Sequence, residues 1–128
     1  MKILVAEDNV ISMEIVKSVI ESVTEAKAEV LTATNGRELV QLFSQSEVGE
    51  VQVIITDVIM PEMDGLTAAA SIRVLDRPDA KTVPIVALSA FFADAEVEKA
   101  KAIGMTDFIN KPVDRERMAE VIRKYVHA

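Results

Sequence analysis

Five short apolar segments alternate with longer segments of helical period, and this alternation restricts the fold more than any other feature of the sequence. It is typical of a parallel sheet with helices on both faces. The apolar segments are mostly continuous, as expected for strands that are buried on both sides. The predicted strands are Ile3–Ala6, Ala28–Thr32, Val51–Thr56, Ile85–Leu88 and Asp107–Ile109. The predicted helices are Val10–Val23, Gly36–Ser46, Leu66–Leu75, Asp94–Ile103 and Arg115–Val126.

The connections between these segments are short and contain no recognisable linker. Asp94 and Asp114 stand where N-caps are expected, and the segment Asp76–Thr82 is predicted to be a polar loop without chemistry. The 128 residues suffice for one core, so residues 1–128 are predicted to form a single α/β domain.

Charge and composition exclude several functions. The net charge of −7 repels the phosphates of nucleic acids, so we expect protein partners and no direct nucleic-acid binding. No apolar run approaches the roughly 20 residues of a membrane span, and no signal peptide is visible, so a cytoplasmic location without membrane contact is expected. The chain has no Cys, and its one His, His127, is expected in a frayed tail, which leaves oxygen ligands for any metal.

Acidic residues follow two of the predicted strands. Glu7 and Asp8 come directly after the first strand, and Asp57 ends the third. Ligands of open α/β sheets bind at the carboxyl ends of the strands, so these three carboxylates are expected in one site. Their mutual repulsion favours a hard cation such as Mg²⁺ or Mn²⁺. Taken alone, Glu7 and Asp8 could instead be solvated acids stabilised by a helix N-terminus.

Asp57 is carried by a buried strand, which suits a nucleophile that must be held rigidly. A carboxylate can attack phosphorus to form an acyl phosphate when cations neutralise the phosphoryl oxygens. Lys111 would supply one positive charge, and Ser89 would supply a hydroxyl donor. A lone lysine or serine is usually an ordinary surface or turn residue, but these two stand at successive strand ends.

Over its whole length the sequence resembles the receiver domains of two-component response regulators and hybrid histidine kinases. The resemblance rests on Glu7-Asp8-Asn9, on the segment from Asp57 to Gly65 (Asp-Val-Ile-Met-Pro-Glu-Met-Asp-Gly), on Leu88-Ser89-Ala90 and on Lys111-Pro112, all in family order. It implies a flavodoxin-like (βα)5 three-layer sandwich whose five-stranded parallel sheet has the order 2-1-3-4-5. It also implies a cis peptide bond at Lys111-Pro112, an isomer that the residues alone leave open.

The resemblance also implies roles for the site residues. Asp57 is the expected phosphoacceptor, and Asp8, Asp57 and the backbone carbonyl of Ile59 are the expected ligands of Mg²⁺, with Glu7 holding a metal-bound water. Ser89 is expected to move toward the phosphoryl group, to which Lys111 pairs. Phe108 then turns inward behind Ser89, at a position where the family often has tyrosine.

A phosphohistidine on a histidine kinase or a histidine phosphotransfer protein is the expected donor. The expected output is a conformational switch, read by a downstream protein on the face formed by 94–103, 107–109 and 115–126. Such a chain promotes only its own phosphorylation and dephosphorylation and is not otherwise an enzyme. The sequence leaves open the pathway, the cognate kinase, the target, the oligomeric state, and whether the chain stands alone or belongs to a larger protein.

Three other functions compete with this interpretation. A haloacid dehalogenase-type phosphohydrolase needs a second Asp at the position of Ile59, and a nucleotide or flavin module needs a glycine-rich loop in place of Glu7-Asp8-Asn9. A phosphorylation-independent interaction domain of the same fold remains the alternative, although the complete residue set argues against it.

Two further hypotheses concern the rim of the site. Val10 and Ile11 fall off the apolar stripe of their helix and are expected to be exposed, as a landing surface for the phosphodonor. Ile59 and Phe91 are expected to border the path of the hydrolytic water. Neither side chain can orient a water, so slow loss of phosphate is expected.

Overall fold

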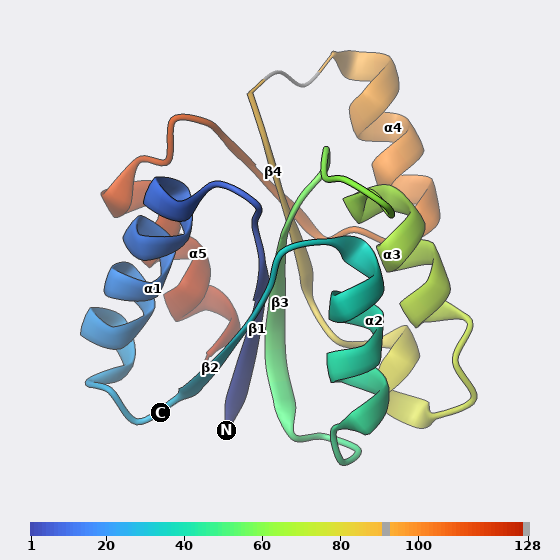
Figure 1. Ribbon diagram of the computed structural model, residues 1–128, viewed down its shortest axis with the longest axis horizontal. Coiled ribbons are helices and arrows are strands. Elements are labelled where there is room, and N and C mark those ends of the chain that lie inside the picture. The colour runs from blue at the N-terminus through green and yellow to red at the C-terminus, as the bar shows by residue number, and fades with distance from the viewer. Residues whose placement is uncertain (91–92, 127–128) are drawn as a thin grey trace.

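The computed structural model describes residues 1–90 and 93–126. Within these ranges, five parallel strands form one sheet in the order β2-β1-β3-β4-β5, with helices on both faces (Figure 1). The strands are β1 (Lys2–Ala6), β2 (Glu29–Ala33), β3 (Val51–Asp57), β4 (Ile85–Ser89) and β5 (Asp107–Asn110). The helices are α1 (Val10–Thr24), α2 (Gly36–Gln45), α3 (Gly65–Arg73), the 3-10 helix η1 (Pro78–Lys81), α4 (Asp94–Ile103) and α5 (Arg115–Tyr125). The predicted fold and strand order are confirmed.

The predicted boundaries agree with these elements to within one residue, except at the end of α3, which stops at Arg73 rather than at Leu75. No helix in the described ranges has both the length and the apolar character that a membrane crossing requires.

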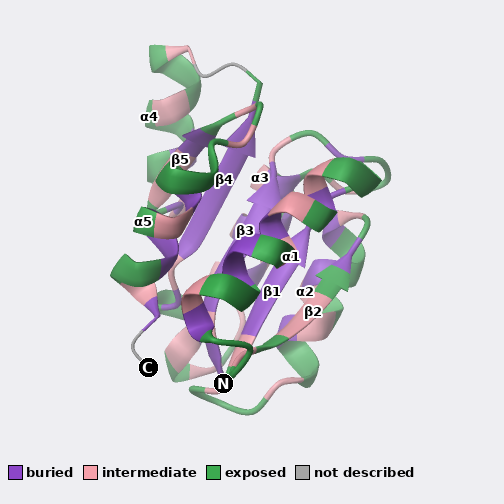
Figure 2. Ribbon diagram, turned by 90° about the vertical axis from the view of Figure 1, so that its left-hand side faces the viewer, coloured by how far each residue is buried: buried purple, intermediate pink, exposed green. Residues whose placement is uncertain are grey.

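The sheet separates two apolar cores. Helices α1 and α5 cover one face, and α2, α3 and α4 lie on the other (Figure 1). Successive residues of β3 alternate between the two cores: Ile54 packs on the side of α2 and α3, whereas Val53 and Ile55 pack on the side of α1 and α5. The strands are consequently buried from both sides, as the continuous apolar runs predict (Figure 2).

Side chains cap the N-termini of four α-helices. The capping residues of α1, α2, α3 and α5 are Asn9, Asn35, Asp64 and Asp114, and each side chain accepts a hydrogen bond from a backbone N–H of the first turn. The prediction for Asp114 is therefore confirmed. The prediction for Asp94 is wrong, because Ala93 occupies the cap position and Asp94 is already the first helical residue. Asp94 still places an acid in the first turn, where the helix dipole favours it.

The segment 76–82 is more ordered than a polar loop, because it contains η1. The guanidinium of Arg77 donates to Asp79 Oδ1 (2.6 Å) and to the carbonyl of Phe43 at the end of α2 (2.8 Å). It also lies over the Phe43 ring, 4.3 Å from the centroid. Arg77 thus fastens η1 to the C-terminal end of α2.

Candidate functional site

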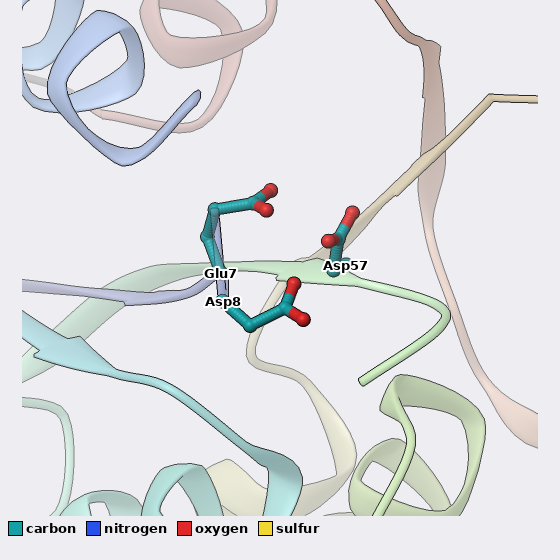
Figure 3. Close-up of side chains that lie close together, drawn as sticks. All are labelled: Glu7, Asp8 and Asp57. Atoms are coloured by element: carbon teal, nitrogen blue, oxygen red, sulfur yellow. The ribbon is translucent and has the colours of Figure 1, made fainter. Parts of the chain in front are cut away.

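Three carboxylates meet at the carboxyl edge of the sheet. Glu7 and Asp8 follow β1, and Asp57 is the last residue of the neighbouring strand β3. One carboxylate oxygen from each residue lies within 4.8 Å of the other two. Figure 3 shows Glu7 and Asp8 extending toward Asp57. Glu7 and Asp57 are buried, with 1% and 5% of their surface exposed, whereas Asp8 is exposed.

Lys111 joins two of these acids. Its Nζ lies 2.7 Å from Asp57 Oδ1 and 2.8 Å from Glu7 Oε2. Its backbone N–H donates to the carbonyl of Ser89 (2.8 Å), and the peptide bond to Pro112 is cis, as the resemblance implies. One ammonium therefore faces two buried carboxylates, with a third beside them.

The backbone around Asp57 is held by the adjacent strand and by the start of α3. The N–H of Val58 donates to the carbonyl of Leu88 (2.9 Å), and the N–H of Gly65 donates to the carbonyl of Val58 (2.8 Å). A Cβ at position 65 would lie 2.0 Å from the carbonyl oxygen of Asp57. Gly65 is therefore required because α3 begins against the backbone of the strand that carries Asp57.

A small cavity opens beside Asp57. It has a volume of about 140 Å³ and is lined by Asp57, Ile59, Leu88, Ser89, Ala90 and Lys111. Ser89 ends β4 and is 8% exposed, whereas the Ile59 residue is 79% exposed at the rim. Phe108 on β5 is half-buried and packs against the core on the side of α2, α3 and α4. Phe91 and His127 lie outside the described residues.

Burial dominates the electrostatics of Asp57. The pKa of this carboxyl is raised to about 7, mainly by burial; the hydrogen bond from Lys111 acts to lower it, and the neighbouring Glu7 acts to raise it. Burial acts to lower the pKa of Lys111, but its bonds to Asp57 and Glu7 outweigh that effect, and the net shift is upward. The site thus carries more negative charge than its lysine neutralises.

The donor set fits a hard divalent cation. All three acids offer oxygen, the ligand that Mg²⁺ prefers. Glu7 Oε2 is buried and accepts no well-formed hydrogen bond from the described residues, although Lys111 Nζ lies at ion-pair distance. A buried carboxylate oxygen in this state favours a cation nearby.

Comparison with known proteins identifies the family. The model of the response regulator receiver domain matches residues 3–123. The chain belongs to the receiver domain family.

Relatives of this receiver domain include larger signalling proteins. The osmosensing histidine protein kinase SLN1 of Saccharomyces cerevisiae is 33% identical over 131 residues, which cover 99% of this chain and 10% of the kinase. The chain spans about a tenth or less of this kinase and of two hybrid histidine kinases of Dictyostelium discoideum.

Two solved structures are similar in fold. One chain in the crystal structure of the yeast phosphotransfer protein Ypd1 with the receiver domain of Ssk1 is 28% identical, with a TM-score of 0.82 and coverage of 98% of this chain and 88% of that chain. The receiver domain of the sensor kinase PA1611 of Pseudomonas aeruginosa, solved with a magnesium ion in its active-site cleft, has a TM-score of 0.82 and coverage of 97% and 95%. Its 24% identity supports likeness of fold alone.

Most residues that the sequence singled out lie together. Glu7, Asp8, Asp57 and Lys111 form the charged centre, and Ile59 and Ser89 line the cavity beside it. Phe108 lies on β5, which is separated by β4 from the strand that carries Asp57. Their roles in phosphotransfer stay predictions. Sequence reasoning missed the ion pair between Lys111 and Glu7, for which a separation of 104 residues gives no local signal.

The raised pKa of Asp57 predicts that its ionisation opposes folding when no metal is bound. Between the ordinary carboxyl pKa of about 3.9 and the folded value of about 7, the folded state binds more protons than the unfolded state. The free energy of unfolding of the parent therefore falls as pH rises through this window, and Asp57→Asn lacks this loss. We expect the variant to be the more stable by on the order of 2 kcal/mol at about pH 8, with the gap closing toward pH 4.

Urea unfolding across this pH range, in buffer treated with a chelator, measures the gap. Asp76→Asn, at an exposed acid, is the control and should show no such trend. Added Mg²⁺ should stabilise the parent more than Asp57→Asn, because ligands that bind the folded state stabilise it. A gap independent of pH would contradict the assignment.

Proposed function

We propose that Asp57 accepts a phosphoryl group from a phosphohistidine in a two-component phosphorelay, and that residues 1–128 act as a single receiver unit. The observation that carries this proposal is the position of the Asp57 carboxylate, at the wall of an open cavity between two further acids and Lys111. The pairing of a phosphotransfer protein with a receiver domain in the yeast Ypd1 complex supports this class of donor.

The reaction needs little covalent chemistry from the protein. An oxygen of Asp57 attacks phosphorus, a P–O bond forms, and the P–N bond to the imidazole breaks with its electron pair passing to nitrogen. Lys111 Nζ, already beside Asp57, pairs with a phosphoryl oxygen, and the hydroxyl of Ser89 donates to another. The chain turns over no independent substrate in this reaction, so it is a switch rather than an enzyme.

Mg²⁺, or Mn²⁺ in its place, is the proposed cofactor. Asp8, Asp57 and the carbonyl of Ile59 would hold it, and Glu7 would hold a water bound to it. The cation supplies neutralisation of charge on the transferred group. The excess of carboxylates over ammonium at the site supports this choice.

Ser89 and Phe108 are the proposed switch residues. Ser89 borders the cavity, and Phe108 lies on β5 next to the strand that Ser89 ends. Phe108 has no hydroxyl to hydrogen-bond at the surface, which favours an inward position. The proposed output is a change on the face of α4, β5 and α5, where a downstream protein binds.

Acetyl phosphate with Mg²⁺ should add one phosphoryl group to the chain, detected by intact mass spectrometry, and Asp57→Asn or a chelator should abolish the gain. Asp64→Asn is the matched control, because this exposed acid caps α3 and lies outside the acid cluster. It should label like the parent. Persistent labelling of Asp57→Asn would overturn the central assignment.

Two exposed apolar side chains stand next to the acids. Val10 and Ile11, the first residues of α1, are 76% and 73% exposed, which confirms the predicted exposure. Val16, Val19 and Ile20 form the buried stripe of the same helix. Position beside the site supports the proposal that Val10 and Ile11 contact the phosphodonor protein.

Val10→Glu and Ile11→Glu should slow transfer from a phosphohistidine protein, measured with the fastest donor in a panel that includes yeast Ypd1. Labelling by acetyl phosphate should stay unchanged, because the small donor needs no protein contact. Val74→Glu, at a residue 78% exposed beyond the end of α3, is the matched control and should transfer normally. Equal slowing by Val74→Glu would remove the docking role.

Phosphorylated Asp57 should be long-lived, because the exposed Ile59 side chain cannot orient a water for attack on phosphorus. Ile59→Asn introduces a polar group at this rim and should speed the loss of phosphate by about tenfold or more. Ile59→Leu, which stays apolar, should decay like the parent. The decay is followed by mass after removal of acetyl phosphate, and equal rates in all three proteins would refute the idea.

A further inference from the structure

The C-terminal end of α4 is fastened by one arginine. Gly104 ends the helix in a left-handed conformation, with φ of 117°. Its carbonyl accepts hydrogen bonds from Arg73 Nε (3.1 Å) and Nη2 (2.6 Å), and Arg73 Nη1 donates to the carbonyl of Ala80 (3.1 Å). Arg73 is the last residue of α3. A single guanidinium therefore links the ends of α3, η1 and α4.

This attachment is specific in shape and charge. Arg73 forms no ion pair with a carboxylate in the described part of the chain, and burial lowers its pKa. Its charge instead meets the carbonyl of Gly104, at the negative end of the α4 dipole, and the carbonyl of Ala80 in η1. A Cβ at Gly104 would lie 2.8 Å from Arg73 Nε, so the side chain packs directly on this residue.

The N-terminal end of α4 is held differently. Of the α-helices in the described ranges, only α4 lacks a side-chain hydrogen bond at its N-cap, where Ala93 stands. Ala100 is its one buried residue, and it lies in the C-terminal half. Figure 2 shows most of α4 exposed, and Figure 1 shows it standing beside α3. Within the described residues, the half of α4 that follows β4 and Ser89 therefore has neither a buried residue nor a side-chain cap.

We propose that Arg73 is the pivot of α4: it fixes the C-terminal end of the helix, so that changes beginning at Ser89 move the N-terminal end alone. This difference between the two ends of α4 is present in the unphosphorylated chain. Its use in signalling rests on the function proposed for Asp57. The pivot would determine how a partner on the face of α4, β5 and α5 senses the state of the site.

Native-state hydrogen exchange tests the pivot without phosphate. In the parent, the amides of Gly104 and Met105, which donate to the carbonyl of Ala100, should exchange more slowly than those of Val97 to Lys99. Arg73→Ala should speed exchange at Gly104 and Met105 by roughly 10- to 100-fold relative to β4, the effect of losing hydrogen bonds to a charged donor. Arg73→Lys, which keeps the charge but not the fork of donors, should act in the same direction and covers the case that the alanine variant does not fold.

Arg77→Ala is the matched control. Arg77 is also a partly buried arginine that bonds to helix-end carbonyls, but it joins η1 to α2, and none of its hydrogen bonds or ion pairs within the described residues reaches α4. It should leave the exchange of Gly104 and Met105 relative to β4 unchanged. Uniform exchange along α4 in the parent, or equal effects of the two arginines on Gly104, would overturn the pivot.

A second arm joins the pivot to phosphorylation. After acetyl phosphate labelling, exchange in the parent should change at Val97 to Lys99 and stay constant at Gly104 and Met105, whereas in the Arg73 variants the change should reach both. The extent of labelling itself should be equal in all of them. If the parent takes no phosphoryl group, the function proposed for Asp57 fails and the first arm stands. If the parent is phosphorylated and exchange changes equally at Val97 to Lys99 and at Gly104 and Met105, the signalling role of the pivot is refuted.

Discussion

Lys111 lies at ion-pair distance from the buried carboxylates of Glu7 and Asp57, and the sheet holds all three groups at its carboxyl edge. Burying one carboxylate is costly unless it is paired, and here one ammonium serves Glu7 and Asp57 while Asp8 adds a third negative charge beside them. The edge therefore keeps a residual negative charge that packing alone cannot remove. This residual negative charge favours the binding of a divalent cation. Lys111 has two carboxylate partners, so it keeps one of them when the other is taken up by a cation.

The buried carboxylates can be held close together because the strands that carry them are rigid. β1, β3 and β4 are covered on both faces, and the start of α3 presses against Asp57 so closely that position 65 must be glycine. A side chain on such a strand loses little entropy when it reacts, since its backbone is already fixed. The apolar residues at the rim are exposed instead of buried. Val10, Ile11 and Ile59 are each more than 70% exposed, so they are available to another protein without any change in the core.

The sequence predicted the fold well because the relevant signals are local. Continuous apolar runs and helical periods span single elements, so the elements could be assigned almost to the residue. The acid cluster followed from one further step, since parallel strands bring their carboxyl ends together. Interactions between distant polar residues could not be derived in this way. Arg77 stands in a segment that looks like a solvated loop, and only the folded chain shows that it stacks on Phe43 and bonds to the end of α2. The cap of α4 was misassigned because Asp94 has the right chemistry one residue too late.

The placement of the caps has a consequence for how this fold can move. In a parallel α/β sheet, each helix begins at the same edge where the strands end, so an N-cap also fixes a loop beside the site. Asn9, Asp64 and Asp114 fix the loops that follow β1, β3 and β5 in this manner. The strand that ends in Ser89 leads into the one α-helix whose cap position, within the described ranges, carries no such bond. At the opposite edge, arginines tie helix ends to their neighbours through backbone carbonyls, which no change at the site disturbs directly. Movement that starts at the cavity beside Asp57 therefore meets least resistance at the beginning of α4, and the rest of the carboxyl edge stays fixed around Asp57.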